Sequence, residues 1–151
     1  MSALTGQAML PALLALYGRH EPAFFDYLEY RREQERFAAG LAAERATKAD
    51  KARIKDILSA LTRAWQDGDA DASREADYAL HTAIVDASQN ATMIHMMASV
   101  FELTQQSVFY NRDFLNSIDG SGQMLLDQHI ALGEAIIRGD VDAARTAAGD
   151  H

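Results

Sequence analysis

Hydrophobic and polar residues follow each other along this chain with the three-to-four-residue spacing of amphipathic helices. Alanine, leucine and charged residues dominate, and proline occurs at Pro11 and Pro22 alone. No stretch keeps the strict alternation that is typical of a β-strand. The pattern therefore predicts an all-α protein.

Capping residues and glycines divide the pattern into segments. A short apolar segment over 8–17 ends at Gly18, and a turn over 20–22 is expected to precede the first long helix. Thr47 followed three residues later by Asp50 has the form of a capping box. Helices are therefore expected over about 24–46, 47–65, 69–89, 91–115, 123–138 and 140–151.

Length, composition and charge narrow the class of protein. The 151 residues are enough for one domain with a buried core. The absence of cysteine excludes disulfides and thiolate metal sites. No apolar run is long enough to span a membrane, and the first residues lack the basic region of a secretory signal, so a cytoplasmic protein is expected. A formal net charge of −8 argues against direct nucleic-acid binding.

Four polar residues fall on the apolar stripes of the predicted helices. Asp77 and His81 are four residues apart and share one face, His129 lies in the middle of a stripe, and His151 ends another. One buried histidine usually has a carbonyl group or a water as its partner. Four such residues on inward-facing stripes instead favour a bound metal ion, whereas His95 is expected to be solvated.

Nitrogen and oxygen ligands without sulfur indicate the class of ion. Zinc or nickel is expected, with manganese or iron as alternatives. Four protein ligands leave open positions on an octahedral ion, and a chelating acid could fill them.

Two charged residues, Arg31 and Glu35, lie on the apolar stripe of the first long helix. One interpretation is an internal ion pair between them. The other is an arginine that binds an anion and is oriented by Glu35. The spacing leaves both open.

Three stretches carry a family resemblance: EYRREQERFAAGLAAERATKAD, DYALHTAIVDASQNATMIHMM and DQHIALGEAIIRGDVDAARTAAGDH. Together they resemble the C-terminal effector-binding (FCD) domain of the FadR subfamily of GntR transcription regulators. The resemblance implies an antiparallel bundle of about six to seven helices with a central metal and ligand cavity. It also implies that residues 1–22 are a segment from a missing DNA-binding domain, and that 23–151 form the sensing domain with a truncated last helix.

The resemblance assigns roles to individual residues. It implies that Asp77, His81, His129 and His151 bind the metal, and that Arg31 contacts a carboxylate. Asn90 is expected to be a structural helix cap. The stretch FFDYLEYRREQERFAAGLAA is similar to the branch that responds to pyruvate or lactate. The implied partners are a small organic acid, a second copy of the chain, and DNA through a separate winged helix-turn-helix domain, with no membrane.

Two other functions compete with a sensor. A helical metalloenzyme acting on a small carboxylate needs a general base, and Glu35 is the candidate on a suitable stripe. A ferritin-like site needs Glu-x-x-His pairs, but Tyr78 and Leu126 stand three residues before His81 and His129. A metal-stabilised dimerisation domain is the third possibility. A regulator rather than an enzyme is expected, with its cavity lined in part by Phe101, Thr104 and Val108.

Overall fold

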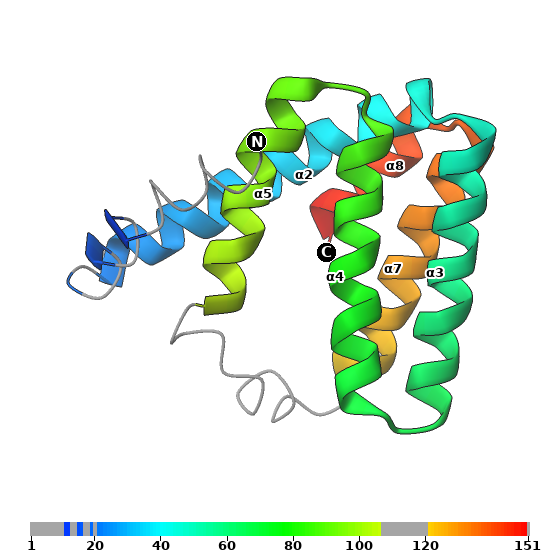
Figure 1. Cartoon of the computed structure of the whole chain (residues 1–151), viewed down its shortest axis with the longest axis horizontal. Helices are drawn as coiled ribbons and strands as arrows, with labels where there is room; N and C mark the ends of the chain where they lie inside the picture. The colour runs from blue at the N-terminus through cyan, green and yellow to red at the C-terminus, as the bar shows by residue number, and fades with distance from the viewer. Residues whose placement is uncertain (1–10, 13–14, 17–18, 20, 107–120, 151) are drawn as a thin grey trace.

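A computed structural model describes residues 11–12, 15–16, 19, 21–106 and 121–150 (Figure 1). This part of the chain contains no strand, which confirms the all-α prediction. Its helices are α2 (Glu21–Arg45), α3 (Lys48–Gln66), α4 (Ala70–Ala87), α5 (Ala91–Gln106), α7 (Ser121–Arg138) and α8 (Val141–Asp150).

The capping residues set several helix boundaries as predicted. The Thr47 hydroxyl accepts a hydrogen bond from the backbone N–H of Asp50 at 3.1 Å, and the Asp50 carboxylate accepts one from the Thr47 N–H at 2.9 Å. The Asn90 side chain accepts a bond from the N–H of Met93 at 3.0 Å, which confirms Asn90 as a helix cap. Gly139 adopts a φ of +77° between α7 and α8, a conformation that glycine reaches without steric cost.

The start of the first long helix differs from the prediction. The expected turn over 20–22 was wrong at Glu21 and Pro22, which both belong to α2. Proline fits there because the first turn of a helix does not use its backbone N–H groups for internal hydrogen bonds. The predicted helix over 91–115 is seen as far as Gln106, and residues 107–120 lie outside the described part of the chain.

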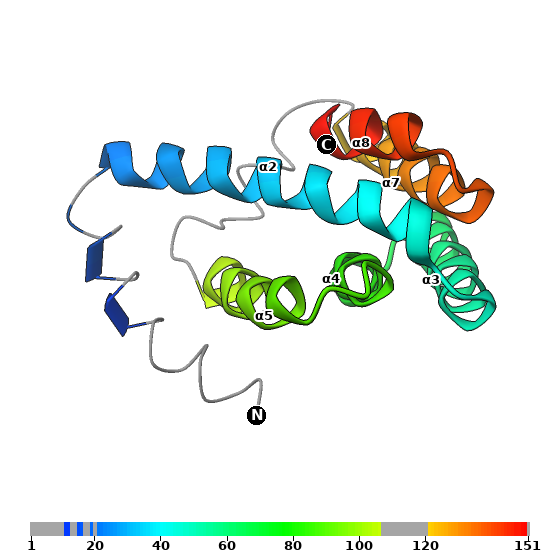
Figure 2. The same cartoon turned by 90° about the horizontal axis from the view of Figure 1, so that it is seen from above.

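Alanine brings the helices of the bundle close together. In the main core, Ala39, Ala42 and Ala43 of α2 face larger side chains such as Leu80 of α4 and Ile136 of α7. A small residue on one helix allows a large one on its neighbour to fill the space at close packing density. Figure 2 shows the result: α2 crosses the molecule with α4 and α5 on one side and α7 and α8 on the other.

A second cluster fixes α5 against α2 and α4. It contains Met93, Met97 and Phe101 of α5. The buried hydroxyl of Tyr27 on α2 donates a hydrogen bond to the carbonyl of Val100 at 3.1 Å. None of the described helices has the length and apolar character needed to cross a membrane. These contacts place one face of α2 beside both α4 and α5.

Candidate metal centre

Two helices supply three polar side chains that converge in the bundle. Asp77 and His81 come from successive turns of α4, and His129 comes from α7. One ligand atom from each of these residues lies within 4.8 Å of the others. The structure therefore brings together three of the four predicted ligands, while His151 lies outside the described residues.

The Asp77 carboxylate stands between the two imidazole rings. Its Oδ1 contacts Nε2 of His129 and lies 3.4 Å from Nε2 of His81. Both histidines are buried, and the rings meet edge to face with their centres 5.6 Å apart. The Asp77 side chain is 28% exposed, so one side of the group is open to solvent.

The other ring nitrogens have partners of their own. Nδ1 of His129 lies 2.5 Å from the carbonyl oxygen of Leu125, one turn earlier on α7. Because a carbonyl oxygen only accepts, this Nδ1 carries the proton. Nδ1 of His81 lies 2.7 Å from Oε1 of Glu35, which reaches it from α2. In both rings, therefore, Nε2 is the nitrogen directed at Asp77 and suited to bind a metal.

The charges of the group influence one another. Burial acts to raise the pKa of Asp77, but the hydrogen bonds with His129 and His81 outweigh it and hold this pKa well below its ordinary value. Burial acts to lower the pKa of His81, whereas the charge of Glu35 and the hydrogen bond with Asp77 raise this pKa to about 10. His81 is therefore protonated at neutral pH in this arrangement, and a metal ion must displace its Nε2 proton.

Arg31 lies beside this group on α2. Its Nη2 is 3.6 Å from Oε1 of Glu35, so the internal pair, one of the two interpretations that the spacing left open, is present. The guanidinium carbon also lies 6.0 Å from the centre of the Phe101 ring, within range of a cation–π contact. Both side chains of the pair are largely buried, at 19% and 13% exposure.

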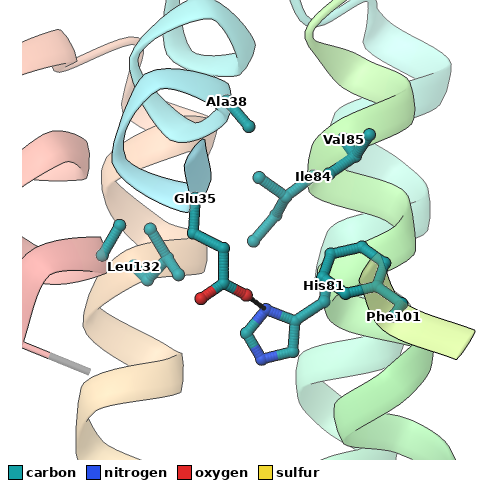
Figure 3. A pocket seen from close by; sticks show the side chains of 8 residues that line it. Glu35, Ala38, His81, Ile84, Val85, Phe101 and Leu132 are labelled. Carbon is teal, nitrogen blue, oxygen red and sulfur yellow. Dashed lines mark ion pairs between the residues drawn. The ribbon is translucent and has the colours of Figure 1, made fainter. Parts of the chain in front are cut away.

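A small cavity adjoins His81 and Glu35 (Figure 3). Phe101 lines it, as predicted, together with residues of α2, α4, α7 and α8: Glu35, Ala38, His81, Ile84, Val85, Leu132 and Ala148. The Thr104 side chain and Val108 lie outside what the structure describes. Glu35 of α2 and His81 of α4 therefore both face this cavity.

Sequence reasoning placed Glu35 on the inner stripe but missed its contact with His81. Helical spacing relates residues of one helix and cannot pair α2 with α4. His95, expected to be solvated, is exposed on α5.

The donor set suits a divalent ion. Two imidazole nitrogens and one carboxylate oxygen converge from α4 and α7, and the chain has no cysteine. Three protein ligands leave further coordination positions for other donors. A metal site at this position is therefore chemically consistent with the residues present.

The chain is similar to known proteins along most of its length. Residues 26–151 match the FCD domain family. A protein of Escherichia coli strain K12 named for regulation of the L-lactate dehydrogenase operon is 35% identical over 127 residues, which cover 84% of this chain and 48% of that protein. The HTH-type transcriptional regulator LutR of Bacillus subtilis strain 168 is 36% identical over 121 residues, covering 80% of this chain and 54% of LutR.

A third curated relative is also named as a regulator, and one solved structure has a similar fold. The galactonate operon transcriptional repressor of Escherichia coli strain K12 is 34% identical over 107 residues, covering 71% of this chain and 44% of the repressor. The solved structure of Escherichia coli McbR/YncC matches the fold with a TM-score of 0.71 at 19% identity, over 87% of this chain and 61% of that one. The chain spans about half the length of the curated relatives it matches. These relatives are named as regulators, which confirms the expectation of a regulator rather than an enzyme.

Proposed function

This chain belongs to the FCD domain family, and we propose that it senses a small carboxylic acid for a transcription regulator by binding that acid at a divalent metal ion. The observation that carries this proposal is the convergence of Asp77, His81 and His129 next to Arg31. This arrangement offers ligands for a cation and, beside them, a group that binds anions.

Asp77, His81 and His129 would hold the metal, and His151 is proposed as the fourth ligand. Zinc or nickel fits the nitrogen-rich set, and manganese or iron is also compatible with it. When bound, such an ion supplies a positive centre to which a carboxylate oxygen can coordinate.

Arg31 would contact the carboxylate of the acid. The guanidinium group presents several N–H donors in a plane and matches a carboxylate in shape and charge. A divalent ion together with the side chains of Asp77, Glu35 and Arg31 would carry a formal net charge of about +1, so the site would attract an anion although the chain is acidic. Without Glu35 this net charge would be one unit higher.

Pyruvate, lactate or a related 2-oxo or 2-hydroxy acid is the proposed effector. Such acids carry a second oxygen next to the carboxylate and can chelate an ion through two atoms. One relative is named for the L-lactate dehydrogenase operon, and this supports an acid of that class.

In the complete regulator, the acid would change the affinity for DNA of a separate winged helix-turn-helix domain. It can do so only through a difference in its affinity for two arrangements of the bundle. Contacts with Arg31 on α2 and with a metal on α4 and α7 would provide such a difference. A cytoplasmic homodimer is the form proposed for the complete protein.

Isothermal titration calorimetry tests the proposal. The chain loaded with zinc or nickel is expected to bind pyruvate or L-lactate, and the chain treated with a chelator is not. Acetate, which lacks the adjacent oxygen, is the matched control and should bind more weakly. A metal-loaded chain that binds none of these acids would contradict the sensor function, and a melting temperature that falls on chelation would then indicate a purely structural metal.

A further inference from the structure

Glu35 has a position that the proposed metal and acid contacts do not explain by themselves. It belongs to α2, whereas Asp77, His81 and His129 belong to α4 and α7. Figure 3 shows its carboxylate directed at the His81 ring, with the ion pair drawn between them. We propose that Glu35 is a positioning residue, which holds His81 in the orientation and tautomer that a metal ion requires. This inference rests on the proposed metal site.

The direction of the contact separates this role from that of a metal ligand. Glu35 meets Nδ1 of His81 at 2.7 Å, while Nε2 on the other side of the ring faces Asp77. The convergent group of ligand atoms includes Asp77, His81 and His129. Glu35 therefore lies on the side of the imidazole ring opposite the group of ligand atoms. A carboxylate there accepts the Nδ1 proton and leaves Nε2 to donate its lone pair to a metal.

The surroundings of Glu35 indicate that its carboxylate is there for these contacts. The next inward-facing residues of α2, Ala38, Ala39 and Ala42, are fully buried and apolar. A charged group at 13% exposure on such a stripe is unfavourable unless its partners compensate for the lost hydration. His81 and Arg31 are such partners.

The two histidines depend on different parts of the fold. Nδ1 of His129 contacts the carbonyl oxygen of Leu125 on its own helix, so this contact depends on α7 alone. His81 is oriented by a residue of α2, so its geometry depends on where α2 lies. The same carboxylate pairs with Arg31. Glu35 thus links the helix of the proposed anion contact to a metal ligand on α4.

An apolar variant removes the carboxylate that the positioning role requires. In E35L, a side chain of similar size replaces it and removes a charged partner of Arg31 and His81, so the metal-free melting temperature should fall. Zn²⁺ binding by E35L is therefore measured at a temperature below its unfolding transition. Its affinity for Zn²⁺, measured by competition with a chromophoric chelator, should fall about 10- to 100-fold.

Two companion variants sharpen the result. E35Q retains an oxygen that accepts the Nδ1 proton, so it should recover part of the lost Zn²⁺ affinity. E33Q changes a glutamate of the same helix that is 62% exposed, and it should bind Zn²⁺ as the native chain does. Nitrogen-15 spectra of the Zn²⁺-loaded chain should show His81 bound through Nε2 with the proton on Nδ1, and E35L should broaden or shift these signals.

The outcomes are distinguishable. E35L with native Zn²⁺ affinity and native imidazole signals would overturn the positioning role and leave the metal site standing. E35Q without any recovery would show that hydrogen-bond acceptance is not the mechanism. A native chain that binds no Zn²⁺, Ni²⁺, Mn²⁺ or Fe²⁺ would instead remove the proposed function on which this inference rests.

Discussion

Replacing His129 by alanine is expected to abolish metal binding. His129 provides the ligand nitrogen from α7, while Asp77 and His81 both come from α4. Without it, two ligands from one helix remain among the described residues, and their affinity for the ion should be much lower. His129→Ala also removes a ring that is 6% exposed and in contact with the Asp77 carboxylate.

Two contributions set the size of the effect on stability. An ion present at 100 times its dissociation constant stabilises the native chain by about 2.7 kcal/mol. For a domain of about 150 residues this corresponds to roughly 5–11 °C in melting temperature. Loss of a hydrogen-bonding partner for a buried carboxylate costs about 1–3 kcal/mol more. The lower end is expected because Asp77 is 28% exposed and water can replace part of the lost contact.

The assay combines elemental analysis with thermal denaturation in the presence of metal or chelator. The native chain should carry close to one equivalent of ion and lose thermal stability on chelation, whereas His129→Ala should carry little ion and show no response to chelation. His95→Ala, at an exposed position on α5, is the control and should behave as the native chain. A His129→Ala variant that keeps a full equivalent of metal would refute the ligand assignment.

Three further predictions concern the anion contact, proton release and a helix cap. Arg31→Lys should weaken binding of the acid about 10- to 100-fold while the metal remains bound, because lysine lacks the planar guanidinium group of arginine. Calorimetric titration measures this loss. Arg32→Lys, at an exposed position of the same helix, is the control and should bind the acid as the native chain does. Because the pKa of His81 is raised to about 10, metal binding at pH 7–9 should release about one proton, and the apparent affinity for the metal should rise with pH. Calorimetric titrations in buffers of different ionisation enthalpy measure the number of protons released. Equal heats in all buffers would contradict the prediction. Thr47→Ala should destabilise the fold by about 1 kcal/mol at pH 7. The backbone hydrogen bond with Thr47 lowers the pKa of Asp50, so this half of the capping box is fully formed above the ordinary aspartate value and is lost as pH falls through the lowered one. Urea denaturation should therefore show a smaller difference between Asp50→Ala and the native chain at pH 2 than at pH 7.

The sequence predicted most of the fold because its boundaries depend on local chemistry. Thr47 with Asp50 and the cap at Asn90 act within three residues of themselves, and the structure confirms them. The prediction failed at Pro22, where a residue that usually ends helices lies in a first turn that tolerates it. Local signals fix where a helix begins more readily than which neighbour it contacts.

The candidate site was likewise predictable where it depends on spacing within one helix. Spacing showed that Asp77 and His81 share a face and that His129 points inward, and the structure places these three side chains together. The pairing of Glu35 with His81 joins residues 46 positions apart on different helices. That pairing depends on how α2 crosses α4, which the alanines of α2 and their larger neighbours determine by packing. No periodicity within one helix contains this information.

The length of α2 has a mechanical consequence. About 14 residues separate Glu35 from the first residue of the helix at Glu21, a distance of about 21 Å along its axis. A tilt of about 5° around the site would displace that far end by about 2 Å, since a helix behaves as a stiff rod over this length. Figure 2 shows this part of α2 extending past α7 and α8. Any effector that tilted α2 about Arg31 and Glu35 would therefore move the amino-terminal end of this helix much further than the residues beside the site.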